Sequence, residues 1–92
     1  MKQMHILWVD DEIDLLKPFI LFLEERNYPV ETCNNGTDAI EKVVENKYDL
    51  VILDEMMPGL DGLSTLQEIK RINPALPIVM VTKSEEEGLM DK

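Results

Sequence analysis

Residues 50–53 read LVIL and run directly into Asp54. A short, continuous apolar run of this kind is typical of a strand that is buried on both faces, as in a parallel sheet. Residues 4–9 form a similar, almost continuous apolar run, and two further short strands are predicted at residues 29–33 and 78–81. The sequence therefore predicts four strands that form the centre of the fold.

The segments between these runs carry apolar residues at helical spacing, which predicts helices over residues 13–27, 36–46 and 63–73. A fourth helix is expected from Ser84, because Glu87 three residues later completes a capping box. The residues expected to face the core are Leu15, Leu16, Phe19, Ile20 and Leu23, then Ala39, Ile40, Val43 and Val44, then Leu63, Leu66, Ile69 and Ile72.

Polar residues mark where two of these helices begin. Asn35 and Asp61 are predicted N-caps, because their short side chains can accept hydrogen bonds from the first turn of the helix that follows. Pro18 is expected near a helix start or at a kink, since proline removes a backbone donor and crowds the preceding turn.

Strands that alternate with helices at this spacing indicate βαβ units. Right-handed crossovers then place helices on both faces of the sheet. The predicted fold class is α/β with a doubly wound parallel sheet. The length of 92 residues allows one small domain, residues 1–92.

Charge and composition limit the classes of function. The net charge is −10, which argues against binding of nucleic acid or an anionic membrane by this segment. No apolar stretch approaches the roughly 18 residues of a transmembrane helix, and the first residues lack the apolar core of a signal peptide. One cysteine, Cys33, makes no internal disulfide. A cytoplasmic location is expected.

Acidic residues stand where the predicted strands end. The first strand ends in Asp10-Asp11, the third in Asp54, and the fourth in Thr82. In open α/β sheets the ligand site lies beyond the carboxyl ends of the strands, so these side chains are expected to converge. Carboxylates that converge repel one another unless a cation lies among them, and Mg²⁺ is a hard cation that prefers oxygen ligands. A carboxylate beside Mg²⁺ can act as a nucleophile toward phosphorus.

These residues carry a resemblance to a known family. The pair Asp10-Asp11, the run DEMMP over residues 54–58, Gly62 and Thr82 together resemble the CheY-like receiver domains of response regulators, and the resemblance covers nearly the whole chain. It implies a flavodoxin-like fold with strand order 2-1-3-4, continued in the family by a fifth strand. The segments MHILWVDDE (residues 4–12) and VTKSEEE (residues 81–87) are similar to the receiver of PorX-type regulators, in which the receiver is joined to an alkaline-phosphatase-like output domain.

The resemblance implies a role for each matching residue. Asp54 would be the phosphoacceptor, which takes a phosphoryl group from a sensor histidine kinase or a phosphotransfer protein. Mg²⁺ would be held by Asp11 and Asp54 directly, by Asp10 through water, and by the backbone carbonyl of Met56. Thr82 would be the switch hydroxyl. Pro58 and Gly62 are expected to shape the loop. The output domain would lie beyond the chain end.

The chain departs from the family pattern at its end. The family has a fifth strand that ends in a lysine, followed by a fifth helix, and this chain is expected to stop before both. Lys83 is not that lysine, because it directly follows Thr82 at the end of the fourth predicted strand. The expectation is a receiver that is incomplete at its C-terminus. The strand over residues 78–81 would then be an exposed edge, which invites a homodimer or a domain swap.

Two other functions stay open at this point. One is a pseudo-receiver, an interaction module that works without phosphorylation. The other is a metal-dependent phosphatase with an aspartyl nucleophile, similar to the haloacid dehalogenase type. That type needs Asp-x-Asp after the first strand, where this chain has Asp10 and Glu12. Asp10 and Asp11 could also simply cap the first helix.

Overall fold

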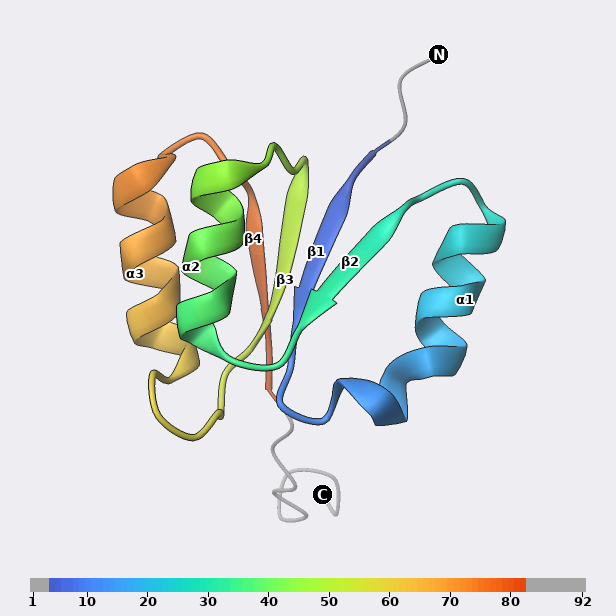
Figure 1. The fold of residues 1–92 in the computed structure, drawn as a ribbon, viewed down its shortest axis with the longest axis horizontal. Helices are drawn as coiled ribbons and strands as arrows, with labels where there is room; N and C mark the ends of the chain where they lie inside the picture. Colours follow the sequence, from blue (N-terminus) through green and yellow to red (C-terminus); the bar gives the residue numbers. More distant parts are fainter. Residues whose placement is uncertain (1–3, 83–92) are drawn as a thin grey trace, which may run out of the picture.

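The computed structural model describes residues 4–82, which form a four-stranded sheet with helices on both sides (Figure 1). Along the chain the elements are β1 (Ile6–Val9), the 3₁₀ turn η1 (Ile13–Leu16), α1 (Lys17–Glu25), β2 (Val30–Cys33), α2 (Gly36–Glu45), β3 (Leu50–Asp54), α3 (Gly62–Ile72) and β4 (Ile78–Val81). All four predicted strands are present. The first is shorter than predicted and begins at Ile6. The helix predicted from Ser84 lies outside the described residues, as does Lys83.

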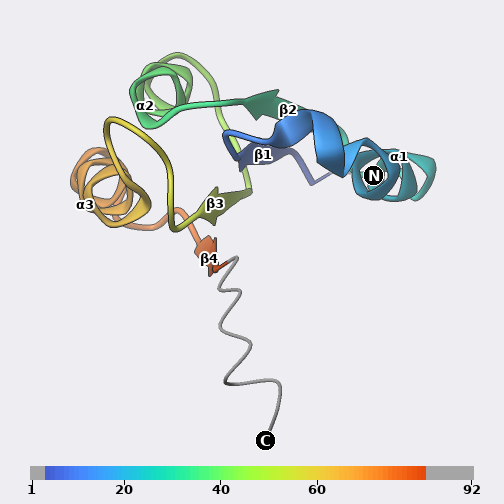
Figure 2. The ribbon, with the colours of Figure 1, turned by 90° about the horizontal axis from the view of Figure 1, so that it is seen from below.

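The strands pair in parallel in the order β2-β1-β3-β4, which confirms the predicted fold class. Helices α2 and α3 cover one face of the sheet, and α1 lies on the other (Figure 2). In the register, Val9 of β1 is level with Leu53 of β3, and Leu53 is level with Met80 of β4. The chain therefore leaves these three strands at the same edge of the sheet.

The core lies between the sheet and the two helices α2 and α3. Its fully buried side chains are Leu7, Val9, Ala39, Val51, Leu53 and Ile69. Burial of Ala39, Val43 and Ile69 was predicted and is confirmed. Val44 and Leu63 were predicted to face inward, and this was wrong, because 64% and 56% of their surfaces are exposed. The buried positions of α3 are Gly62, Thr65 and Ile69, and Leu63 lies about 100° around the helix from Gly62.

Helix α1 buries less than its sequence pattern predicts. No residue of α1 or of the preceding turn η1 is buried, and Leu15 of η1 and Phe19 of α1 are 70% and 59% exposed. Leu16, Ile20 and Leu23 are half-buried, which is the spacing of one helical face. The predicted inward stripe was therefore too wide, and its Leu15 and Phe19 positions lie outside the covered face. Pro18 lies in the first turn of α1, just after η1, as predicted.

Both predicted helix caps are present. The side chain of Asn35 accepts a hydrogen bond of 2.7 Å from the Asp38 N–H, and that of Asp61 accepts one of 2.9 Å from the Ser64 N–H. These bonds satisfy backbone donors that have no partner inside the helix. Among residues 4–82, no helix combines the length and the apolar character needed to cross a membrane.

The two sides of α3 give a direct test of this packing. Ile69→Ala is expected to lower the free energy of unfolding by about 2–5 kcal/mol, because it leaves a cavity in the core. Leu63→Ala on the same helix is the matched control and is expected to change it by less than about 0.5 kcal/mol. Urea unfolding followed by circular dichroism measures both. Equal losses in the two variants would contradict the assigned orientation of α3.

Candidate functional site

Three aspartates meet at the carboxyl ends of β1 and β3. Asp54 is the last residue of β3, and Asp10 follows the last residue of β1. Because Val9 and Leu53 are level in neighbouring parallel strands, the next residue of each strand reaches the same position at the edge of the sheet. Asp11 opens the turn that leads to η1. The structure thus brings together the three aspartates that the sequence singled out.

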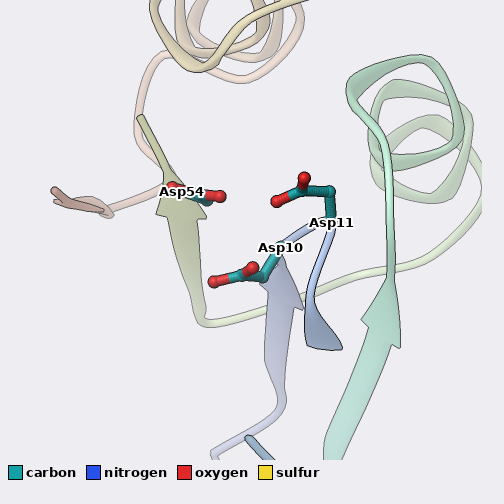
Figure 3. A group of neighbouring side chains, drawn as sticks. All are labelled: Asp10, Asp11 and Asp54. Atoms are coloured by element: carbon teal, nitrogen blue, oxygen red, sulfur yellow. The ribbon is translucent and has the colours of Figure 1, made fainter. Parts of the chain in front are cut away.

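The three carboxylates are close enough to share one ion. Each offers an oxygen, and these oxygens all lie within 4.8 Å of one another. Figure 3 shows the Asp10 and Asp54 side chains at the ends of their strands, with Asp11 beside them. Asp54 is completely buried, Asp10 is 4% exposed, and Asp11 is exposed. The group is therefore open to solvent on the side of Asp11.

Backbone N–H groups orient two of the carboxylates. The Glu12 N–H donates to Asp10 Oδ1 at 2.8 Å, and the Met56 N–H donates to Asp54 Oδ1 at 3.1 Å. Such bonds restrict the rotation of a carboxylate. The main chain is held as well, because the Glu55 N–H donates to the Val81 carbonyl at 2.9 Å. The site is thus fixed by the sheet itself.

An oxygen donor set with this spacing suits a divalent cation. Carboxylates within 4.8 Å of one another repel, and a cation between them removes that cost. Mg²⁺ prefers oxygen ligands and keeps several waters, which fits a group that is buried on one side and exposed on the other. Glu12 is not one of this group of three. Glu12 stands at the position where the phosphatase alternative needs a second aspartate.

The loop between β3 and α3 is shaped by two glycines. Gly59 has φ +79°, a conformation that side chains disfavour. At Gly62, an added Cβ would lie 2.4 Å from the Asp54 carbonyl oxygen and 2.7 Å from the Glu55 Cα. The Gly62 N–H also donates to the Glu55 carbonyl at 3.1 Å, which ties the end of the loop to its start. The loop-shaping roles of Gly62 and Pro58 stay predictions.

Met56 and Thr82 lie at the same edge of the sheet as the three aspartates. The Met56 amide contacts Asp54, and the Met56 side chain is 64% exposed. Thr82 directly follows Val81, which is level with Asp54 in the register of β3 and β4, and it is exposed. Both residues are thus at the predicted edge of the sheet. The metal-binding role of the Met56 carbonyl and the switch role of Thr82 stay predictions.

Two residues that contact the end of the β3–α3 loop were not singled out from the sequence. Thr65 is fully buried in α3, although threonine is usually exposed, and Gly36 packs against it from α2. The only signal in the sequence was a polar residue on the face of α3 that carries Ile69.

Cys33 is half-buried, and this burial raises the pKa of its thiol to about 11. It is therefore a poor nucleophile at neutral pH.

Comparison with known proteins identifies the family. The family model of the response regulator receiver domain matches residues 6–92. The chain belongs to this family. ResD, a transcriptional regulatory protein of Bacillus subtilis, is 43% identical to this receiver over 87 residues, which are 95% of this chain and 36% of ResD. A CpxR homolog of Haemophilus influenzae is 43% identical over 82 residues, which are 89% of this chain and 35% of that protein. The receiver thus spans about a third of the length of these relatives.

Solved structures agree with the fold. The response regulator TrrA of Thermotoga maritima, in complex with Mg²⁺-BeF, superposes with a TM-score of 0.83 and 36% identity, over 91% of this receiver and 73% of that chain. A CheY-like receiver domain of Methanospirillum hungatei gives 0.84 and 25% identity, over 98% and 74%. The predicted family and fold are confirmed, and this is a receiver domain of a two-component response regulator. The PorX-type resemblance stays a prediction.

Proposed function

We propose that this receiver accepts a phosphoryl group on Asp54 and passes the signal on as a change of conformation, as a switch and not as a turnover enzyme. The observation that carries the proposal is the group of three aspartates, whose carboxylate oxygens lie within 4.8 Å of one another at the ends of β1 and β3. Asp10, Asp11, Asp54 and the backbone carbonyl of Met56 are proposed to hold Mg²⁺. Bound there, the ion would neutralise charge on the phosphoryl group.

The residues of the receiver position the reacting carboxylate. A carboxylate oxygen of Asp54 forms a bond to phosphorus, while the bond from phosphorus to the donor breaks and its electron pair leaves with the donor. The Met56 N–H, at 3.1 Å from Asp54 Oδ1, restricts how that carboxylate can turn. Burial of Asp54 excludes bulk water from one side, which favours a fixed geometry over solvent rearrangement.

The partners follow from the chemistry and from the relatives. The proposed donor is a sensor histidine kinase or a phosphotransfer protein, and the proposed target is an output domain in the remainder of the protein. ResD and the CpxR homolog are transcriptional regulatory proteins and are much longer than this receiver. Thr82 is proposed as the residue that responds, because it follows the strand that pairs with Asp54.

An interface between two copies is also proposed. In the sheet of residues 4–82, β4 is an edge strand, and its Val79 is 49% exposed. Unpaired backbone groups along such an edge can pair with another chain. A homodimer or a domain swap through β4 would appear as twice the monomer mass in light scattering.

The proposed function is tested by chemical phosphorylation. Incubation with Mg²⁺ and acetyl phosphate is expected to add one phosphoryl group to the intact mass of the receiver, and Asp54→Asn is expected to abolish it, because an amide is a poor nucleophile. Asp49→Asn is the matched control: it changes an aspartate at the opposite end of β3 and is expected to keep the adduct.

Two further outcomes are decisive. Omission of Mg²⁺ should also abolish the adduct. No adduct on the parent chain, in a sample shown by circular dichroism to be folded, would contradict the proposal and favour an interaction module that works without phosphorylation. An adduct that persists in Asp54→Asn would place the acceptor elsewhere.

A further inference from the structure

A close contact between α2 and α3 lies directly behind the β3–α3 loop. Gly36, the first residue of α2, is buried, and a Cβ added there would lie 2.1 Å from Thr65 Oγ1 of α3. The same atom would lie 3.1 Å from the Leu60 carbonyl oxygen and 3.3 Å from the Leu60 Cβ. Only the missing side chain of glycine therefore allows the start of α2 to approach both α3 and the end of the loop this closely.

Thr65 links this contact to the end of the loop. It is fully buried, and its hydroxyl donates to the Asp61 carbonyl at 2.8 Å. The Thr65 N–H donates to the same carbonyl at 3.0 Å. Asp61 in turn accepts from the Ser64 N–H and caps α3. A displacement of the Thr65 hydroxyl is therefore expected to displace the peptide of Asp61 with it.

The two ends of the loop are held together. It contains residues 55–61, and its two ends are joined by the hydrogen bond from the Gly62 N–H to the Glu55 carbonyl. The backbone of Gly62 already lies against that of Asp54 and Glu55, with no room for a Cβ. One residue further along, the Met56 N–H contacts Asp54 Oδ1. Movement at Leu60 or Asp61 should thus reach Met56.

We propose that Gly36 and Thr65 are positioning residues for the phosphoryl site, because their contact fixes the loop that places the Met56 backbone beside Asp54. Each is proposed to act through the loop, whose end they contact at Leu60 and Asp61. The inference rests on the proposed function, since it concerns how the same site is held in place.

The central test is Gly36→Ala. Alanine is a better helix former than glycine, so helix propensity alone predicts no loss. The proposal instead predicts that the affinity for Mg²⁺ falls by about 10-fold to 100-fold, the range found when residues behind a metal site are changed. It also predicts a shifted amide resonance of Met56 in the metal-free protein. Fluorescence of Trp8, the single tryptophan, two residues before Asp10, measures Mg²⁺ binding.

Three further variants separate positioning from general packing. Gly36→Ala combined with Thr65→Ala removes the nearest clashing atom but also the hydroxyl bond to Asp61, so it is expected to bind Mg²⁺ more tightly than Gly36→Ala and still to show a shifted Met56 amide. Thr65→Val keeps the volume but loses the hydroxyl bond to Asp61, so it should shift the Met56 amide without a clash. Val43→Ala is the control, because it weakens the packing of α2 away from the loop and should leave the affinity unchanged.

Each outcome decides the inference. The inference is overturned if Gly36→Ala folds and keeps both the Mg²⁺ affinity and the Met56 amide resonance of the parent chain. It is also overturned if Val43→Ala loses as much Mg²⁺ affinity as Gly36→Ala. If Gly36→Ala does not fold, Thr65→Val and the double variant decide, and parent values of the Met56 resonance in both would overturn it. Failure of the parent chain to bind Mg²⁺ or to accept a phosphoryl group would instead contradict the proposed function. The Met56 resonance would still report on the positioning.

Discussion

Gly62→Ala is expected to lower the free energy of unfolding by about 3 kcal/mol or more, at the upper end of the cost of overpacking. The added Cβ would lie 2.4 Å from the Asp54 carbonyl oxygen, 2.7 Å from the Glu55 Cα and 2.9 Å from the Glu55 carbonyl oxygen. All three are backbone atoms, which cannot move away by a change of rotamer. The chain must therefore open where β3 ends, and it opens directly beside the proposed phosphoacceptor.

The same loop supplies the control for this prediction. Gly59→Ala introduces the same atom at a position with φ +79° and nothing within 4 Å, so it adds backbone strain without a clash. Its expected cost is about 1–2 kcal/mol. Urea unfolding compares the free energies of unfolding of the two variants, and titration of the folded variants with Mg²⁺ compares their affinities for the ion. A loss at Gly62 no greater than the loss at Gly59 would show that the loop moves freely away from Asp54.

The strands and the aspartate group could be predicted because the sequence carries them locally. The apolar runs that end in Asp10 and Asp54 place each acid at a strand end, and the parallel order of an α/β sheet then brings the strand ends together. The caps Asn35 and Asp61 were equally local, because the bond each makes spans three residues. For these features the local pattern and the global fold agree, which is the condition for prediction.

The burial of individual helix residues could not be predicted as well. A stripe of apolar residues indicates which side of a helix is less polar, but how much of that side is buried depends on the elements that pack against it. Val44 and Leu63 lie at the margins of their stripes and are exposed, whereas Thr65 is polar and fully buried. The contact between Gly36 and Thr65 joins residues 29 positions apart, and no local pattern marks it. Such contacts depend on how two helices pack, which requires the structure.

Asp11→Asn is expected to change stability with opposite sign in the absence and presence of Mg²⁺. Without the ion, three carboxylates with oxygens within 4.8 Å of one another repel, and two of them are buried. Neutralising the exposed one should raise the free energy of unfolding by about 1 kcal/mol, the value for one charge pair at this distance in a solvent-like dielectric. The parent chain pays this cost to keep a site that a cation can fill.

With Mg²⁺, the parent chain should instead have a higher free energy of unfolding than Asp11→Asn. An ion at 100 times its dissociation constant stabilises the folded state by about 2.7 kcal/mol, and a variant that has lost a carboxylate ligand should gain far less. Urea unfolding with EDTA and with Mg²⁺ measures both terms. Asp14→Asn, which removes an acidic side chain in η1 outside the group of three, controls for net charge and should leave the Mg²⁺ effect intact. Equal stabilisation of Asp11→Asn and the parent chain by Mg²⁺ would mean that Asp11 is not a ligand, and the proposed metal site would have to be rebuilt around Asp10 and Asp54 alone.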